Sequence, residues 1–179
     1  MRLKKGIFLL LLCFSGNFLF SQKEIALSFE KLPYMEPLGF WSPREVSNQV
    51  LRTLEPRGIQ AIGFVVGEKI EEIPISYVVL EDWAREGHLL GNGTYAYVDF
   101  NLLSVRDFLG HVADGEKFVR RATRLSQDGK FFRFPMLHVG GELDKRRDAE
   151  KALTRADYRI VPATVVFSDY QFNFFFQDV

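Results

Sequence analysis

The 179-residue sequence has a single cysteine, Cys13, and no apolar run long enough to span a membrane. Cys13 lies in a leader that has the order of a secretory signal peptide: basic residues, a short apolar run and the small residue Ser21. We therefore expect cleavage near Ser21-Gln22, so that residues 1–21 are removed and a secreted or periplasmic chain remains. That mature chain would have no thiol, no disulfide and no transmembrane segment. A lipid anchor at Cys13 is less favoured, because the bulky Leu12 precedes it.

The sequence also lacks an excess of charge of either sign. It has 23 lysines and arginines against 23 acidic residues. Removing the leader takes away three cations and no acid, so the mature chain would carry a net charge of about −3. We therefore expect no nucleic-acid partner. With 47% hydrophobic residues and no internal repeat or linker, residues 22–179 are predicted to form one folded domain that depends on its apolar core.

Runs typical of β-strands alternate along the mature chain with amphipathic helical segments. This order predicts parallel strands joined by crossover helices. One helix start is marked by Ser42, Pro43 and Glu45, which combine a capping serine, an N-terminal proline and a glutamate three residues on. We predict an α/β fold, an incomplete distorted (β/α) barrel of about five parallel strands. The strands are expected at 24–29, 59–66, 88–90, 130–134 and 158–167, and the helices after Ser42, after Pro74, after Ser104 and over 144–156.

Reactive groups in repeated strand–helix units lie where the strands end, because the sheet holds those loops rigidly. Four loops are therefore candidates for a functional site. They contain Glu30-Lys31, residues 92–97, residues 133–138 and Asp169-Tyr170.

Four segments at these loops resemble the landmark motifs of the polysaccharide deacetylase family, also called the NodB-like domain or carbohydrate esterase family 4. The segments are "IALSFEKLP" (25–33), "REGHLLGNGTYAYVDFN" (85–101), "FFRFPMLHVG" (131–140) and "DYRIVPATVVFSDY" (157–170). They occur in the family's order and cover nearly the whole mature chain. The resemblance implies the deacetylase barrel and a hydrolase that removes acetyl groups from sugars with one divalent metal, usually zinc.

The family's first motif, T-F-D-D-G-P or T-F-D-D-L-P, supplies a general base and then a metal ligand, and its second motif, N-H-T-x-x-H, supplies two histidine ligands. The resemblance places the base at Glu30 and the three ligands at Lys31, Gly93 and Tyr97. Lysine is cationic at neutral pH, glycine has no side-chain donor, and tyrosine ionises only near pH 10. We therefore expect no metal cofactor and, at most, impaired catalysis.

Other family positions are retained. The resemblance implies that Arg133 holds the catalytic carboxylate and pairs with Asp169, while Pro135 and Met136 form a groove wall whose backbone N–H faces the oxyanion. Tyr97 and Tyr170 are candidates for stacking on a sugar ring. With the cation absent, the ammonium of Lys31 is expected to supply positive charge beside Glu30 and Asp169.

Several alternatives stay open. A surrogate metal site of Glu30, His138 and Asp169 is less favoured. The sequence ends soon after Asp169, so we expect a shortened domain without the family's late acid histidine and with an open sheet edge available for association. The chain is then either an exported deacetylase-like protein with weak or absent activity, or a non-catalytic protein that binds an N-acetylated glycan or a partner protein. A decayed, truncated gene product is the third possibility.

Overall fold

The computed structural model of the chain describes residues 25–34, 41–73, 76–123 and 129–167. The predicted leader, Asp169 and Tyr170 lie outside these residues. Five strands form one parallel sheet in the order β1-β2-β3-β4-β5. The strands are β1 (Leu27–Leu32), β2 (Ala61–Val65), β3 (Leu89–Asn92), β4 (Lys130–Phe132) and β5 (Tyr158–Ile160). The predicted α/β fold with five parallel strands is therefore confirmed, and the sheet is open, with β1 and β5 at its edges.

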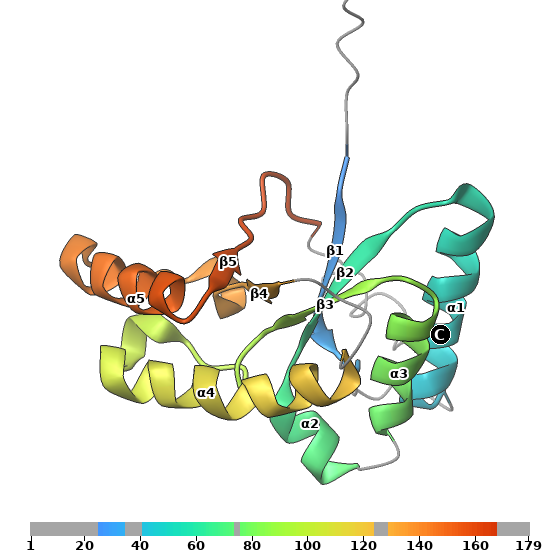
Figure 1. Cartoon of the computed structure of the whole chain (residues 1–179), viewed down its shortest axis with the longest axis horizontal. Helices are drawn as coiled ribbons and strands as arrows, with labels where there is room; N and C mark the ends of the chain where they lie inside the picture. The colour runs from blue at the N-terminus through green and yellow to red at the C-terminus, as the bar shows by residue number, and fades with distance from the viewer. Residues whose placement is uncertain (1–24, 35–40, 74–75, 124–128, 168–179) are drawn as a thin grey trace, which may run out of the picture.

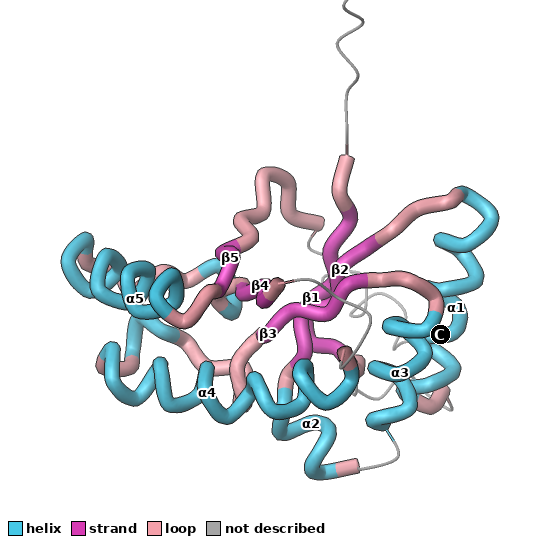
Figure 2. Tube along the Cα trace, in the orientation of Figure 1, coloured by secondary structure: helices cyan, strands magenta, loops and turns pink. Residues whose placement is uncertain are grey.

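Helices lie around the curved sheet, from α1 beside β1 and β2 to α5 beside β5 (Figure 1; strands magenta in Figure 2). The α-helices are α1 (Pro43–Leu54), α2 (Gly67–Glu72), α3 (Tyr77–Arg85), α4 (Val105–Ala122) and α5 (Leu143–Arg155), and short 3-10 helices are η1 (Glu55–Arg57), η3 (Phe100–Leu102) and η4 (Pro135–Leu137). The predicted capping box is present, since the Ser42 hydroxyl accepts from the Glu45 N–H and the Glu45 carboxylate accepts from the Ser42 N–H. None of the helices in the described part of the chain is both long and apolar enough to cross a membrane.

The main differences from the sequence prediction are the ends of β1 and β5 and one additional helix; the strand predicted at 130–134 also ends earlier, at Phe132. β1 continues to Leu32, so Glu30 and Lys31 lie within the strand and not after it. β5 ends at Ile160, where its pairing with Phe132 at the end of β4 also ends, so residues 161–167 are not a strand. The short helix α2 was not predicted, because its six residues are too few to show a helical period.

The core consists of two hydrophobic clusters, one packed against β1 to β3 and the other against β4 and β5. The first packs α1 and α3 against β1 to β3 around Trp83, which is 1% exposed and donates its indole N–H to the Ser47 hydroxyl at 2.8 Å. The second is a phenylalanine cluster between α4, α5 and β4, in which the parallel rings of Phe108 and Phe134 lie 5.5 Å apart. Aromatic pairs of this kind stabilise a core beyond the area that they bury. The core therefore holds both β3 and β4, whose following loops form the candidate site.

Gly115 fixes how closely α4 approaches the loop after β3. A Cβ atom at Gly115 would lie 2.6 Å from the Asn92 Oδ1 and 2.7 Å from the Thr94 carbonyl carbon, which is too close for any side chain. Glycine in a helix interior generally weakens the helix, yet α4 runs through Gly115 without a break. Its role is close packing, which lets the Asn92 side chain donate to the Val112 carbonyl at 2.8 Å.

Candidate functional site

A bulge in β1 places Glu30 and Lys31 at the site. Phe29 pairs with Gly63 and Leu32 with Val65, so β1 has one more residue than β2 between these two pairs. Lys31 takes up the extra length with a left-handed φ of 55°. Bulges re-aim side chains and are common beside functional sites. The positions of Glu30 and Lys31 are therefore set by the bulge within β1.

The Tyr97 hydroxyl connects Glu30, at the base position, to the backbone of Met136. It donates a hydrogen bond to the Glu30 carboxylate and accepts one from the Met136 backbone N–H at 3.0 Å. Burial and the bond to Glu30 raise the pKa of Tyr97 above its ordinary value, so the hydroxyl stays protonated at neutral pH. The Lys31 ammonium lies over the same ring, with its nitrogen 4.9 Å from the ring centroid.

Arg133 joins the two edges of the open sheet. Its guanidinium donates to the Ser28 hydroxyl on β1 at 2.7 Å and, after β5, to the carbonyls of Val161 at 3.1 Å and Pro162 at 3.4 Å. One guanidinium nitrogen also lies 3.7 Å from a carboxylate oxygen of Glu30. The Arg133 side chain is 6% exposed, and desolvation lowers its pKa, although Glu30 opposes this. Arg133 therefore positions Glu30 while binding three other groups.

The residues at the family's ligand positions do not fit a divalent metal. Lys31 presents a cation, Gly93 has no side-chain donor, and the Tyr97 hydroxyl is a neutral donor engaged by Glu30. Among the residues that the structure describes, no group of three or more His, Cys, Asp or Glu side chains is arranged to hold a metal ion. No chemical step through a metal is therefore assigned to these residues.

Three contacts at two-residue intervals join the loop after β3 to the loop after β4. The first is the hydrogen bond from the Met136 N–H to the Tyr97 hydroxyl. Next, the Nδ1 of His138 lies 2.9 Å from the Oδ1 of Asp99. Last, the Gly140 N–H donates to the Asn101 Oδ1 at 3.0 Å. We call this set the loop ladder; it fixes the loop after β3 and the loop after β4 relative to each other.

Strained backbone concentrates at the same place. Among the residues that the structure describes, five non-glycine residues have a positive φ: Lys31, Thr94, Met136, Leu137 and Asp157. All except Asp157 lie in the bulge or in the two loops of the ladder. Such conformations persist where the surrounding structure imposes them, and they cluster at functional sites. The strained backbone is therefore concentrated around the residues that the family motifs indicate.

The predicted site residues are partly brought together. Glu30, Lys31, Tyr97, Arg133 and Met136 meet through the contacts above, and the buried Pro135 begins η4 beside them. Asp169 and Tyr170 lie outside the described residues, and so does any pairing of Asp169 with Arg133 or with a surrogate metal site.

Sequence reasoning missed Ser28; it placed Asp99 in the family segment 85–101 without identifying its partner. His138, considered as a surrogate metal ligand, lies against Asp99, and Arg133 binds Ser28. The turn at Asp99 could have been recognised locally, because an aspartate often accepts a hydrogen bond from the backbone N–H two residues later. Its carboxylate does accept one from the Asn101 N–H at 2.8 Å. Ser28 has no such signal.

The Tyr97→Phe variant tests whether the two hydrogen bonds of the Tyr97 hydroxyl, which together form a bridge from Glu30 to Met136, stabilise the fold. Tyr97→Phe leaves the Met136 N–H without its acceptor and Glu30 without its donor, so we expect the free energy of unfolding to fall by about 1 kcal/mol at pH 8. The raised pKa of Tyr97 means that its stabilising effect is complete below about pH 10 and is lost as the pH rises through the folded-state value. The difference between wild type and variant should therefore shrink above about pH 10 in urea unfolding curves.

The matched control is Tyr95→Phe, which removes an exposed hydrogen bond to Glu71 of 2.7 Å. We expect its unfolding free energy at pH 8 to stay within about 0.5 kcal/mol of wild type. Equal losses in the two variants would contradict a special role for the Tyr97 bridge.

Comparisons with known proteins agree on one family. A family model described as polysaccharide deacetylase matches residues 20–161. A peptidoglycan-N-acetylglucosamine deacetylase of Bacillus cereus is 26% identical over 122 residues, which are 68% of this chain and 38% of the relative. The solved chitin deacetylase of the fungal pathogen Colletotrichum lindemuthianum is 25% identical, with a TM-score of 0.63 over 82% of this chain and 57% of that one.

A solved mutant of a CE4 family pseudoenzyme, described as having restored enzymatic activity, has the same fold. It has a TM-score of 0.64 at 16% identity and aligns with 83% of this chain and 48% of its own. The chain thus spans between 38% and 57% of the length of these relatives.

Proposed function

Because the chain belongs to the polysaccharide deacetylase family, we propose that it is an exported, carbohydrate-related protein whose described site residues do not support metal-dependent deacetylation. The observation that carries this proposal is the Tyr97 hydroxyl, which is hydrogen-bonded both to Glu30 and to the Met136 N–H. A base must be free to take a proton from water, and an oxyanion donor must be free to face the substrate. Here one tyrosine engages both groups.

The loss of metal ligands supports the same proposal independently. A divalent ion would polarise the acetyl carbonyl and activate water in this family. Lys31, Gly93 and Tyr97 cannot supply its ligands, and Lys31 would repel it. Arg133, which matches the family's arginine, and Glu30, at the base position, stay in place through contacts within the protein.

Export is proposed from the sequence alone. The basic start, apolar run and small residue at Ser21 are those of a signal peptide, so we expect the mature chain to begin near Gln22. Sequencing the N-terminus of the protein released from cells checks this boundary. A released chain that still begins with the leader would contradict it.

Metal content and acetate release test the catalytic part of the proposal. We expect the purified chain to carry far less than one zinc per molecule, to release no acetate from N-acetylated chito-oligosaccharides above background, and to melt at the same temperature with and without a chelator. The measurements are elemental analysis, acetate detection and thermal unfolding. Stoichiometric zinc together with acetate release that a chelator stops would overturn the proposal.

A second candidate is a non-catalytic glycan-binding protein that uses the same groove. It is favoured by the loop ladder, which keeps the groove walls in place without a metal, and by Met136, whose side chain is 42% exposed on one wall. Titration of the wild-type chain with N-acetylated chito-oligosaccharides detects this role. Binding that Met136→Asp weakens would support it, and unchanged binding would place the ligand elsewhere.

A further inference from the structure

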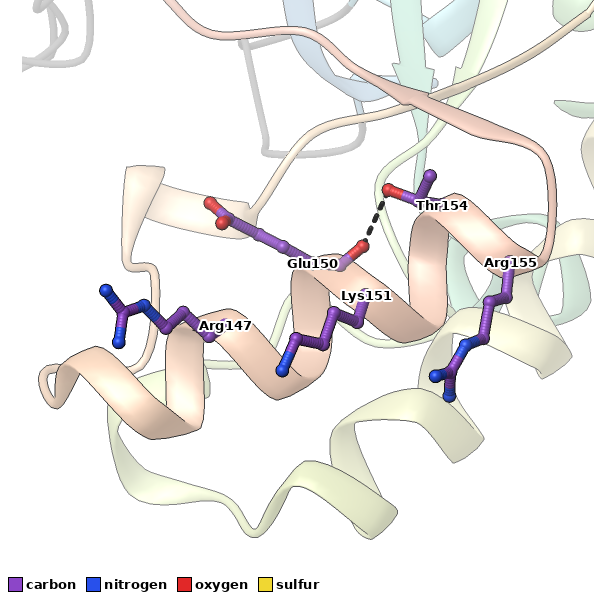
Figure 3. A pocket seen from close by; sticks show the side chains of 5 residues that line it. All are labelled: Arg147, Glu150, Lys151, Thr154 and Arg155. Atoms are coloured by element: carbon purple, nitrogen blue, oxygen red, sulfur yellow. Dashed lines mark hydrogen bonds between the residues drawn. The ribbon is translucent and has the colours of Figure 1, made fainter.

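A stripe of cations runs along the outer side of α5. Arg147, Lys151 and Arg155 follow one another at intervals of four residues and project from the same side of the helix (Figure 3). Together with Glu150 and Thr154 they line an open hollow of about 640 Å³. Four helical residues rise about 6 Å, so the three charges are spread over about 12 Å. We call these three residues the cationic stripe.

The cationic stripe faces away from the core. The buried residues of α5 are Ala149 and Leu153, which lie on the opposite side of the helix. The side chains of Arg147 and Lys151 are 59% and 66% exposed. Their charges are therefore available to a partner in solution.

Acidic neighbours offset the stripe only weakly. The nearest nitrogen–oxygen distances are 3.8 Å from Arg147 to Asp144 and 4.0 Å from Lys151 to Asp148. Asp144 is 94% exposed, and exposed pairs of this kind contribute little. Glu150 is engaged by Arg146, whose Nε lies 2.7 Å from its carboxylate. With Glu150 engaged by Arg146, the three cations of the stripe outnumber Asp144 and Asp148, so the stripe keeps a net positive charge.

The helix that carries the stripe is attached to the loop ladder. α5 starts at Leu143, three residues after Gly140, whose N–H is part of the loop ladder. Lys145 in the first turn of α5 donates to the Asn101 carbonyl at 3.1 Å, which ties the helix to the loop after β3. The cationic stripe begins at Arg147 on this same helix.

We propose that the cationic stripe binds an anionic polysaccharide, one that carries carboxylates at regular intervals along its chain. A linear array of three cations is complementary to a linear array of anions, and the open hollow admits a chain without burying its sugars. This proposal rests on the carbohydrate-related role proposed above. The bound polymer is not a substrate, since no catalytic group lies on the stripe.

Binding to polygalacturonate tests the proposal. We expect the purified chain to bind polygalacturonate at low salt more tightly than neutral dextran, and to release it at about 1 M salt, where charges are screened beyond about 3 Å. The triple variant R147Q/K151Q/R155Q should lose affinity by about tenfold or more. The matched control R106Q/K117Q/R120Q removes three exposed cations of α4 with the same change in net charge, and should stay within about twofold of wild type. Thermal unfolding checks that both variants fold.

Three outcomes would overturn the proposal. Equal losses in both triple variants would show an effect of net charge alone. Wild-type binding to dextran as tight as to polygalacturonate would show that charge plays no part. Tighter binding to inorganic polyphosphate than to polygalacturonate would replace the polysaccharide with a phosphate polymer. Zinc content and acetate release are independent of all three outcomes, so failure here is distinguishable from failure of the proposed function.

Discussion

The triple variant Lys31→Asp, Gly93→His, Tyr97→His is expected to bind about one zinc ion per chain, whereas the wild type is expected to bind far less than one. The backbone positions come from a bulge and a loop whose geometry the structure retains. Asp tolerates the left-handed φ of 55° at position 31 better than most residues do. Replacing Tyr97 also releases Glu30 and the Met136 N–H. Elemental analysis after dialysis measures the zinc.

The side chain introduced at position 93 limits the stability of this variant. A Cβ atom there would lie 3.0 Å from the Val65 carbonyl oxygen and 3.4 Å from two atoms of Phe64, so β2 must shift by a few tenths of an ångström. We therefore expect the triple variant to melt at a lower temperature without zinc and to be stabilised when zinc is added. The control Lys31→Asn, Gly93→Ala, Tyr97→Phe has similar strain and no ligand set. Zinc retention by both variants, or by neither, would show that the three positions do not converge on one ion.

Replacing Arg133 with Met should cost about 3 kcal/mol or more of unfolding free energy. The guanidinium has hydrogen bonds to β1 and to the segment after β5, so its loss leaves the Val161 and Pro162 carbonyls and the Ser28 hydroxyl without their donor. It also removes the positive charge that lies 3.7 Å from the Glu30 carboxylate. Arg133→Lys should recover little, because an ammonium cannot reach three acceptors in the directions of the guanidinium fork. Urea unfolding curves measure both variants.

Arg159→Met is the matched control for Arg133. Arg159 lies on the edge strand β5, is exposed, and has its guanidinium carbon 5.9 Å from the centroid of the Phe131 ring. Its replacement should change the unfolding free energy by less than about 0.5 kcal/mol. If both methionine variants were equally stable, Arg133 would not hold the sheet edges together.

The parallel fold could be predicted because its signals are local. The box around Ser42 begins α1, and the apolar run before Val66 is what a strand buried on both faces requires. The end of β5 could not be predicted, because residues 161–167 have strand-like composition and it is the end of β4 at Phe132 that stops the pairing. Likewise, charged side chains at Glu30 and Lys31 concealed the continuation of β1 through its bulge.

The candidate site could be located from the sequence, but the contacts within it could not be predicted. The family motifs point to Glu30, Tyr97, Arg133 and Met136, and the structure brings these residues together. What the sequence could not show is that the Tyr97 hydroxyl engages both Glu30 and Met136, because residues far apart in sequence meet only after the sheet has formed. A long-range hydrogen bond has no periodic pattern by which to recognise it.

The loop ladder has a thermodynamic consequence. Because its contacts hold the loops after β3 and β4 to each other, a ligand that contacts these two loops meets a preorganised surface and does not have to immobilise them. Association at this place would then carry a small conformational-entropy penalty. Shape complementarity to the two loops, more than any closing motion, would decide which ligands bind there.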